Sequence, residues 1–422
     1  MRTLALLLGL LAGAQDDTPN GDYGDFYTWP EITGRIDQLV KAHPGLLQRS
    51  SLGKTSEGRE IPLLRVTAAK DETAPEILLM AGIHPREQQP QICILELLGE
   101  LVEKYGKDER ITRLVDGRRI WIIPVLNVDG KVYDMKHGNG KDKGANWRKN
   151  RRRNADGSFG VDLNRNFPVR WGSGIEEPKS ETYEGTAPLS EAETRALEKF
   201  FDERPLRAFV DLHSQMKAIL HPIYLAGPDH DRFTKLTAAM QKLQKEPYKV
   251  TEAVKDDDPP PTRGGNTGLS NAWGTYTHGV TSLIFEVAGR GFYDNPVDIR
   301  REYGSSVREP LLHVIEACGD FPLPGKGSAS LSGGSADAPL APGARVQWTP
   351  KVEGPCAYGV LATGDAALQV TSEFRLFPVK SGFDLKVSPK AKPKAEVPMT
   401  LYLWDKDRGR SVLRFTLTVA QP

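Results

Sequence analysis

The chain contains 422 residues, of which 39% are hydrophobic and 26% charged, an ordinary composition for a globular protein. Its formal net charge is only +1, whereas proteins that bind nucleic acids or membrane surfaces through charge are usually strongly basic, so the composition favours neither class. Three cysteines are too few for a disulfide scaffold, and the length exceeds what one hydrophobic core usually supports. We therefore expect two folded domains.

The N-terminus has the pattern of a secretory signal peptide, which we assign to residues 1–14. Arg2 supplies a positive charge, an apolar run extends from Leu4 to Leu11, and the small residues at 12–14 offer a cleavage site. The run is too short to span a bilayer, which needs about 20 apolar residues. A buried N-terminal strand is the alternative. No other stretch resembles a transmembrane helix, so the pattern predicts a secreted or periplasmic protein.

Residues 22–321 alternate strand-like apolar runs with helical patterns, which is typical of an α/β domain. The expected strands include Glu76–Ala81, Arg119–Leu126, Leu206–Leu212 and Thr281–Phe285. Apolar residues at helical spacing predict helices at Gln88–Tyr105 and at Tyr303–Cys318, where the domain ends.

The remainder of the chain has a different composition. Residues 322–343 are rich in Gly, Ser, Ala and Pro, which predicts a flexible linker. Residues 344–422 contain strand patterns, such as Ser372–Val379 and Val412–Val419, separated by turn residues. They predict a small all-β sandwich, for which an accessory role is the simplest interpretation because it carries no group of reactive side chains.

Two histidines and a glutamate lie where predicted strands end. His84 and Glu87 follow the strand at 76–81, and His213 follows the strand at 206–212. Because α/β sheets bind ligands at the carboxyl ends of their strands, the three side chains can converge on one ion. Two imidazoles and one carboxylate form the ligand set of catalytic zinc, which leaves the fourth position for water. A histidine bonded only to the backbone is the plainer interpretation of His213.

Two further features carry charge in unusual places. Glu286 lies within an apolar strand, where burying a carboxylate costs free energy unless the group is paired or takes part in chemistry. A structural salt bridge is the alternative to a catalytic role. Residues 147–153 contain five cations in seven positions, followed by Gly160–Phe167. A solvated basic face or a nucleic-acid patch would explain such a run, but guanidinium groups beside a metal also bind carboxylates and developing oxyanions.

Together these motifs resemble the zinc metallocarboxypeptidase family, known from pancreatic carboxypeptidases A and B. The resemblance covers residues 22–321 and rests mainly on Trp147–Arg151, Gly160–Phe167, Ser180–Tyr183 with Gly185, and Phe285–Glu286. It implies a mixed eight-stranded sheet flanked by helices. It also implies a metallopeptidase with one zinc ion per chain that acts on the C-termini of peptides or proteins.

Carried over by position, the resemblance makes His84, Glu87 and His213 the zinc ligands. Glu286 would be the general base that takes a proton from water and returns it to the leaving amine. Asp162 would orient the first zinc histidine.

The resemblance also implies substrate contacts. Arg151 would polarise the scissile carbonyl and hold the oxyanion, while Asn164 and Arg165 would bind the terminal carboxylate of the substrate. Arg148 and Arg86 match residues of outer subsites.

The sequence departs from the family at one point and leaves three other functions open. The family's substrate-capping tyrosine is expected just before Trp273, but residues 256–271 contain no tyrosine. One alternative is a metallopeptidase that cuts the stem peptides of the bacterial cell wall. Another is a non-catalytic binding protein of the same fold, and a third, based on the basic run, is a nucleic-acid binder.

Overall fold

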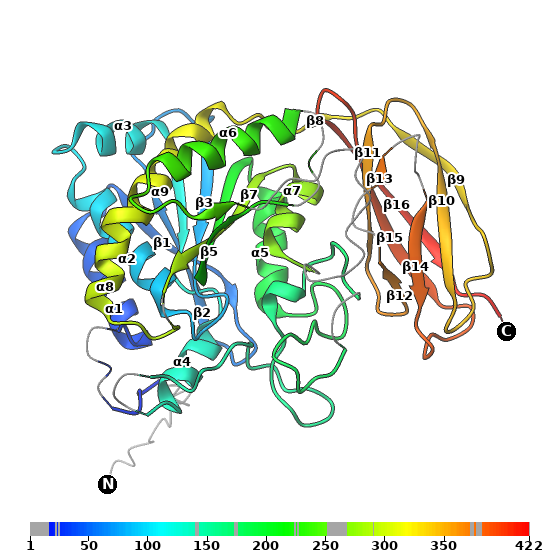
Figure 1. Cartoon of the computed structure of the whole chain (residues 1–422), viewed down its shortest axis with the longest axis horizontal. Coiled ribbons are helices and arrows are strands. Elements are labelled where there is room, and N and C mark those ends of the chain that lie inside the picture. Colours follow the sequence, from blue (N-terminus) through cyan, green and yellow to red (C-terminus); the bar gives the residue numbers. More distant parts are fainter. Residues whose placement is uncertain are drawn as a thin grey trace, which may run out of the picture.

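The structure is a computed structural model in which the α/β and all-β parts lie side by side (Figure 1). It describes residues 17–421 except for 22, 24–25, 140–142, 173–175, 223–224, 226–227, 251–267, 290, 372–374 and 377–381. The signal peptide predicted at residues 1–14 lies outside the described residues. Within those residues, no helix is both long and apolar enough to cross a membrane.

The α/β part alternates strands with helices, as the sequence predicts. The strands are β1 (Leu47–Lys54), β2 (Glu60–Val66), β3 (Glu76–Met80), β4 (Arg119–Ile123), β5 (Leu206–Leu220), β6 (Lys249–Val250) and β7 (Thr281–Ala288). The α-helices are α1 (Trp29–Ala42), α2 (Gln88–Glu103), α3 (Glu109–Gly117), α4 (Val128–Lys136), α5 (Ala192–Glu203), α6 (Pro228–Lys242), α7 (Ser270–His278), α8 (Pro296–Glu302) and α9 (Arg308–Ala317). Short 3₁₀ segments form η1 (Leu163–Arg165) and η3 (Cys318–Asp320), and a π-helical turn, η2 (Tyr303–Val307), precedes α9.

The sheet of this part is mixed. β3 pairs in parallel with β4 and with β5, and β5 pairs in parallel with β7, whereas β2 is antiparallel to both β1 and β4. All five residues of β3 are buried, since helices cover both faces of the sheet (Figure 1). This burial explains why β3 is a continuous apolar run in the sequence rather than an alternating one.

Two successive parts of strand β5 pair with β7, one in each direction. Its first part pairs in parallel, with His213 opposite Glu286, whereas residues 218–220 pair with residues 286–284 in the reverse order. The chain turns at Lys217, whose φ is 52°. The mixed sheet flanked by helices is confirmed; among the described residues it has seven strands rather than the predicted eight, because residues 218–220, which lie between β7 and β6, belong to β5.

The all-β part is a sandwich of two sheets, as predicted. Its strands are β8 (Gly325–Lys326), β9 (Ser330–Ala336), β10 (Arg345–Glu353), β11 (Tyr358–Thr363), β12 (Leu368–Val370), β13 (Arg375–Leu376), β14 (Phe383–Val387), β15 (Glu396–Trp404) and β16 (Gly409–Thr418). The sheets have the orders β12-β14-β10-β9 and β13-β11-β15-β16-β8. Alternate residues of β15, including Val397, Met399 and Leu401, are buried between them, which is the period-two pattern of a sandwich strand.

The segment at 322–343, for which a flexible linker is predicted, contains two strands. β8 pairs with β16 and β9 pairs with β10. Most side chains of β9 are exposed, so the strand needs few large apolar residues and its small residues give no strand signal. Its place is set by backbone hydrogen bonds to β10, the next strand along the chain.

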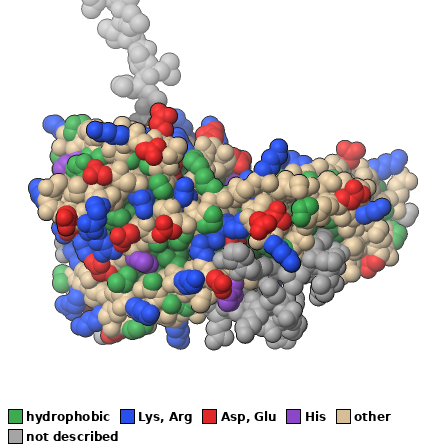
Figure 2. Space-filling model, turned by 90° about the horizontal axis from the view of Figure 1, so that it is seen from above, with side chains coloured by type: hydrophobic (Ala, Val, Ile, Leu, Met, Phe, Trp, Pro, Cys, Tyr) green, Lys and Arg blue, Asp and Glu red, His purple; other side chains and the backbone are tan. Residues whose placement is uncertain are grey.

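Charged side chains are distributed over the surface without large areas of one sign on the face shown in Figure 2, where basic and acidic residues are interspersed. This distribution agrees with a formal net charge of +1.

A buried ionic cluster joins the two parts. Asp229, at the start of α6, lies 2.7 Å from the Arg232 guanidinium and 3.1 Å from that of Arg408, which comes from the all-β part. Arg408 also donates a 2.9 Å hydrogen bond to the carbonyl of Gly279, just beyond α7. A Cβ at Gly279 would lie 2.4 Å from the Trp404 ring, so only glycine allows this close packing.

We expect Asp229→Ala to destabilise the protein, because it leaves two largely buried guanidinium groups without their shared counter-charge. Removing one partner of a buried ion pair costs about 3–5 kcal/mol, which urea unfolding would measure. Asp231→Ala is the matched control, since the Asp231 side chain is 75% exposed, and it should change stability by less than about 0.5 kcal/mol. Equal stability of the two variants would show that the cluster does not hold the parts together.

Candidate metal centre

Adjacent parallel strands bring the predicted site residues to one edge of the sheet. His84 lies in the loop after β3, and His213 and Glu286 face each other across β5 and β7. The Asn127 amide donates hydrogen bonds to the carbonyl of Ile83, at 3.2 Å, and to that of Lys149, at 3.0 Å. Asn127 therefore ties the loop of His84 to the basic segment at 147–153.

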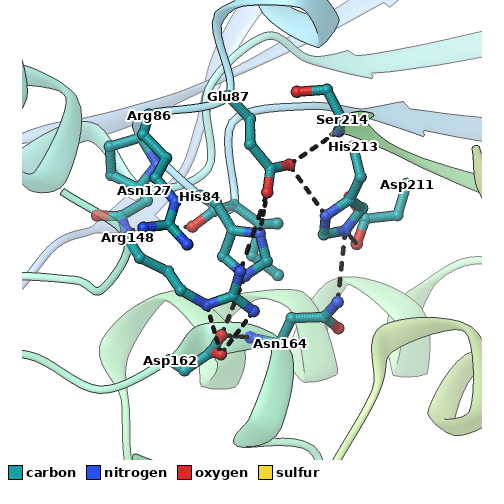
Figure 3. A network of polar contacts seen from close by, with 12 residues as sticks. His84, Arg86, Glu87, Asn127, Arg148, Asp162, Asn164, Asp211, His213 and Ser214 are labelled. Carbon is teal, nitrogen blue, oxygen red and sulfur yellow. Dashed lines mark hydrogen bonds and ion pairs between the residues drawn. The ribbon is translucent and has the colours of Figure 1, made fainter. Parts of the chain in front are cut away.

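The three predicted metal ligands converge. Glu87 lies between the two imidazoles, with Oε1 2.8 Å from Nδ1 of His84 and Oε2 3.2 Å from Nδ1 of His213 (Figure 3). Their ligand atoms all lie within 4.8 Å of one another, and all three residues are buried. A tetrahedral ion with ligands about 2 Å away separates its donor atoms by about 3.3 Å. The donor types and their spacing thus fit zinc.

A carboxylate stands behind each imidazole. Asp162 Oδ1 lies 3.1 Å from Nε2 of His84, and Asp211 Oδ2 lies 3.0 Å from Nε2 of His213. A ring that donates a proton from Nε2 to a carboxylate presents the lone pair of Nδ1 on its other side. Both rings therefore present Nδ1 toward Glu87, where an ion would be bound. Asp162 was predicted from the family resemblance, whereas Asp211 was not predicted.

Asp162 is held by more than the histidine. Arg148 contacts its Oδ2 through Nε at 2.9 Å and Nη2 at 2.8 Å, and the backbone N–H of Asn164 donates to Oδ1 at 3.0 Å. Burial alone would raise the pKa of Asp162, but Arg148 and then His84 hold it well below its usual value. The carboxylate therefore stays ionised as an acceptor for the imidazole.

Glu286 is buried beside this group. Among the described residues, its Oε2 has no hydrogen-bond partner. Burial raises the pKa of Glu286, the positive charge that His213 can carry opposes that rise, and the negative charge of Glu87 adds to it. A carboxylate with a free oxygen and a raised pKa is suited to accepting a proton and releasing it again.

Asn164, one of the two predicted carboxylate-binding residues, lies next to His213. The amide Nδ2 of Asn164 is 3.4 Å from Nε2 of His213, and its Oδ1 accepts a 2.9 Å hydrogen bond from the backbone of Ser270. Arg165 donates from Nη1 to the carbonyl of Asn164 at 2.7 Å. A Cβ at Gly268 would lie 2.1 Å from the Arg165 carbonyl oxygen, so glycine is required where α7 approaches η1.

The structure places Arg148, rather than Arg151, beside the candidate ligands. Arg148 Nη1 lies 4.0 Å from Oε1 of Glu87. The guanidinium carbon of Arg151 instead lies 3.7 Å from the centre of the Tyr133 ring and 4.4 Å from that of Phe159. None of the described contacts joins Arg151 to His84, Glu87 or His213.

Two further members of the basic run have partners of their own. Lys149 donates to the carbonyl of Pro178 at 2.6 Å, and Arg152 pairs with Glu191 at 2.8 Å. These contacts give the two side chains a structural use.

A second group that could hold an ion lies at the junction with the all-β part and comprises Glu198, Asp202 and His278. It contains a single imidazole, which lies 3.3 Å from Glu198 and 3.9 Å from Asp202, and the Asp202 side chain is 66% exposed, whereas the first group has two imidazoles and is wholly buried. Glu198 also accepts a 2.7 Å hydrogen bond from Trp273. This group is better explained as a set of structural contacts.

Comparison with known proteins agrees with this geometry. The family model described as zinc carboxypeptidase matches residues 32–306. Carboxypeptidase A2 from Rattus norvegicus is 32% identical over 227 residues, which cover 53% of this chain and 52% of that protein. The inactive metallocarboxypeptidase ECM14 from Saccharomyces cerevisiae is 28% identical over 298 residues, 66% of each chain. This chain therefore spans about half the length of the carboxypeptidase A2 that it matches.

A solved structure shares the fold. The thrombin activatable fibrinolysis inhibitor superposes with a TM-score of 0.62 over 70% of this chain and 75% of its own, at 23% sequence identity.

We expect zinc to bind at Glu87 rather than at the second group. Glu87→Gln should weaken zinc binding by more than the roughly 10–100-fold that loss of an outer partner costs, since it removes a ligand charge. Competition with a chromophoric chelator would measure this change. Glu198→Gln is the control and should bind zinc like the unmodified chain. The opposite pattern would place the ion at the junction instead.

Proposed function

The chain belongs to the zinc carboxypeptidase family, and on that premise we propose that it is a zinc-dependent metallocarboxypeptidase that hydrolyses the C-terminal peptide bond of peptides or proteins. The observation that carries the proposal is the buried group of His84, Glu87 and His213, with Glu286 beside it and a carboxylate behind each ring. We also propose export, on the basis of residues 1–14; N-terminal sequencing of the exported protein would test for cleavage after Ala14.

We propose that His84, Glu87 and His213 hold the zinc ion. When bound, zinc supplies Lewis acidity, which polarises a carbonyl and makes water a stronger acid. The described residues add a proton acceptor, further stabilisation of the developing negative charge and a binding site for the substrate's terminal carboxylate.

Glu286 is the proposed general base. Its free Oε2 takes a proton from the attacking water while the water oxygen bonds to the scissile carbonyl carbon. The same oxygen then delivers the proton to the leaving nitrogen as the carbon–nitrogen bond breaks, so the carboxylate is regenerated. Its burial supports this role, because a carboxylate in a low-dielectric site binds and releases protons nearer neutral pH.

For the oxyanion we propose Arg151, as the family resemblance implies, and Arg148 as a second candidate. The guanidinium of Arg148 is already oriented by two contacts to Asp162 and lies 4.0 Å from Glu87. A preorganised cation stabilises charge that develops in the transition state without further reorganisation. Arg151 would first have to leave the aromatic rings that enclose it.

Asn164 and Arg165 are proposed to bind the terminal carboxylate of the substrate. The Asn164 amide is fixed by Ser270, so its Nδ2 is directed into the site. The substrate-capping role has no assigned residue, because residues 251–267 lie outside the described part of the chain.

Glu286→Gln should reduce turnover by at least roughly 10²-fold while zinc and peptide still bind, because the amide keeps the shape but cannot accept a proton. Release of a terminal residue, measured beside zinc content and peptide affinity, checks this. Glu246→Gln, on a side chain that is 72% exposed, is the control. Undiminished turnover of Glu286→Gln would assign the proton transfer to another group. An unmodified chain that binds peptides without cleaving them would be a non-catalytic member of the family.

Amidation of the substrate's C-terminus should slow hydrolysis, because it removes the charge that Asn164 and Arg165 bind. A loss of about 2 kcal/mol corresponds to roughly 30-fold in kcat/KM. Paired assays on one peptide, as free acid and as amide, measure the difference. Equal rates would contradict an exopeptidase and favour the cell-wall alternative, which cleavage of stem peptides would then test.

A further inference from the structure

We propose that Asp211 is a positioning residue that fixes the second metal histidine, His213, and that Ser270 at the start of α7 holds Asp211 in place. The proposal rests on the metal site proposed above. It adds to that site two residues that touch neither the ion nor the substrate.

Asp211 is an unusual residue for its position. It lies in the middle of β5 between Val210 and Leu212, and its side chain is fully buried. A carboxylate at such a position is costly unless it has a partner, and an apolar residue would pack there at no such cost. Because successive strand residues alternate between faces, Asp211 and His213 lie on the same face of the sheet. The pairing of the two side chains is therefore a direct consequence of their spacing.

Two hydrogen bonds meet on one oxygen of Asp211. Its Oδ2 accepts a 2.7 Å hydrogen bond from the hydroxyl of Ser270 and lies 3.0 Å from Nε2 of His213. Within the described residues, no lysine or arginine pairs with Asp211 and its Oδ1 has no hydrogen-bond partner. Asp162 differs in having Arg148 as a counter-charge. The orientation of Asp211 thus depends mainly on Ser270.

The same contacts determine which nitrogen of His213 carries the proton. Nε2 faces the Asp211 carboxylate at 3.0 Å and the Asn164 amide nitrogen at 3.4 Å. Asn164 presents the N–H side of its amide to the ring, which alone would suit a bare Nε2, but the Asp211 carboxylate is closer and charged, so its contact decides the tautomer. A bare Nε2 would face the lone pairs of the carboxylate at close range, whereas a protonated Nε2 donates to it. His213 therefore carries its proton on Nε2 and offers Nδ1 to the ion.

Ser270 consequently holds two groups of the site at once. Its hydroxyl fixes Asp211, and through it His213, while its backbone N–H fixes Asn164. One residue at the start of α7 thus sets the geometry of the second metal ligand and of a proposed substrate-binding amide.

Zinc affinity of the full chain tests the proposal. Asp211→Asn should raise the zinc dissociation constant by roughly 10–100-fold, the usual effect of losing an outer partner, and Ser270→Ala should shift it in the same direction by less. Asp129→Asn is the matched control, because Asp129 is also fully buried and hydrogen-bonded but contacts Thr55 and Arg59 instead. It should leave zinc affinity unchanged, whatever it does to stability.

A second measurement separates positioning from simple structural support. In ¹H–¹⁵N spectra of protein with labelled histidines, the His213 Nε2 proton should be shielded from exchange in the unmodified chain and should exchange faster or shift in Asp211→Asn. Unchanged zinc affinity and an unchanged Nε2 resonance in a folded Asp211→Asn chain would overturn the proposal. If that variant does not fold, unchanged affinity in Ser270→Ala overturns it instead. Failure of the unmodified chain to bind zinc would refute the metal site itself, a result distinct from a failure of the variants alone.

Discussion

The parallel pairing of β3, β5 and β7 is the constraint on which the candidate site depends. Parallel strands end at the same edge of a sheet, so residues far apart in sequence meet there without any direct attraction between them. Met80 at the end of β3 lies opposite Asp211, and His213 lies opposite Glu286. A one-residue shift in either pairing would turn the side chains of one strand to the opposite face and disperse the site. The apolar core that fixes this register therefore also fixes the chemistry.

Charge is the second constraint at the site. Four buried carboxylates, Glu87, Asp162, Asp211 and Glu286, lie close together, and among the described ion pairs Arg148 is the one arginine that contacts them. Buried carboxylates that are not balanced by cations are unfavourable, and a divalent cation between the imidazoles offsets this excess directly. The excess negative charge and the two directed Nδ1 atoms are independent reasons for a metal at the same place.

Helix α7 links the site to the all-β part. At its start, Ser270 contacts Asn164 and Asp211. At its end, Trp404 donates a 3.0 Å hydrogen bond to the carbonyl of Tyr276. The sandwich is therefore packed against an element of the site, which gives the accessory part a structural connection to the proposed chemistry.

The sequence determined the features that depend on local periodicity and on motifs. Apolar runs located β3, β4, β5 and β7, and helical spacing located α2 and α9, because these patterns follow from the geometry of a single element. The strand ends identified His84, Glu87, His213 and Glu286, and the family resemblance added Asp162. Asp211 carries the same signal as Glu286, a carboxylate within an apolar strand, and the period of two places it on the face of His213.

Only the tertiary structure decided the remaining features. Arg148 and Arg151 are three residues apart in one irregular segment, and nothing local states which of them faces Glu87; contacts with Asp162 and with the ring of Tyr133 decide it. The strands within residues 322–343 likewise depend on pairing with β16 and β10 rather than on their own side chains. Within a helix or strand, periodicity determines which way each side chain points. The orientation of a side chain in a loop depends instead on the residues that the folded chain packs around it.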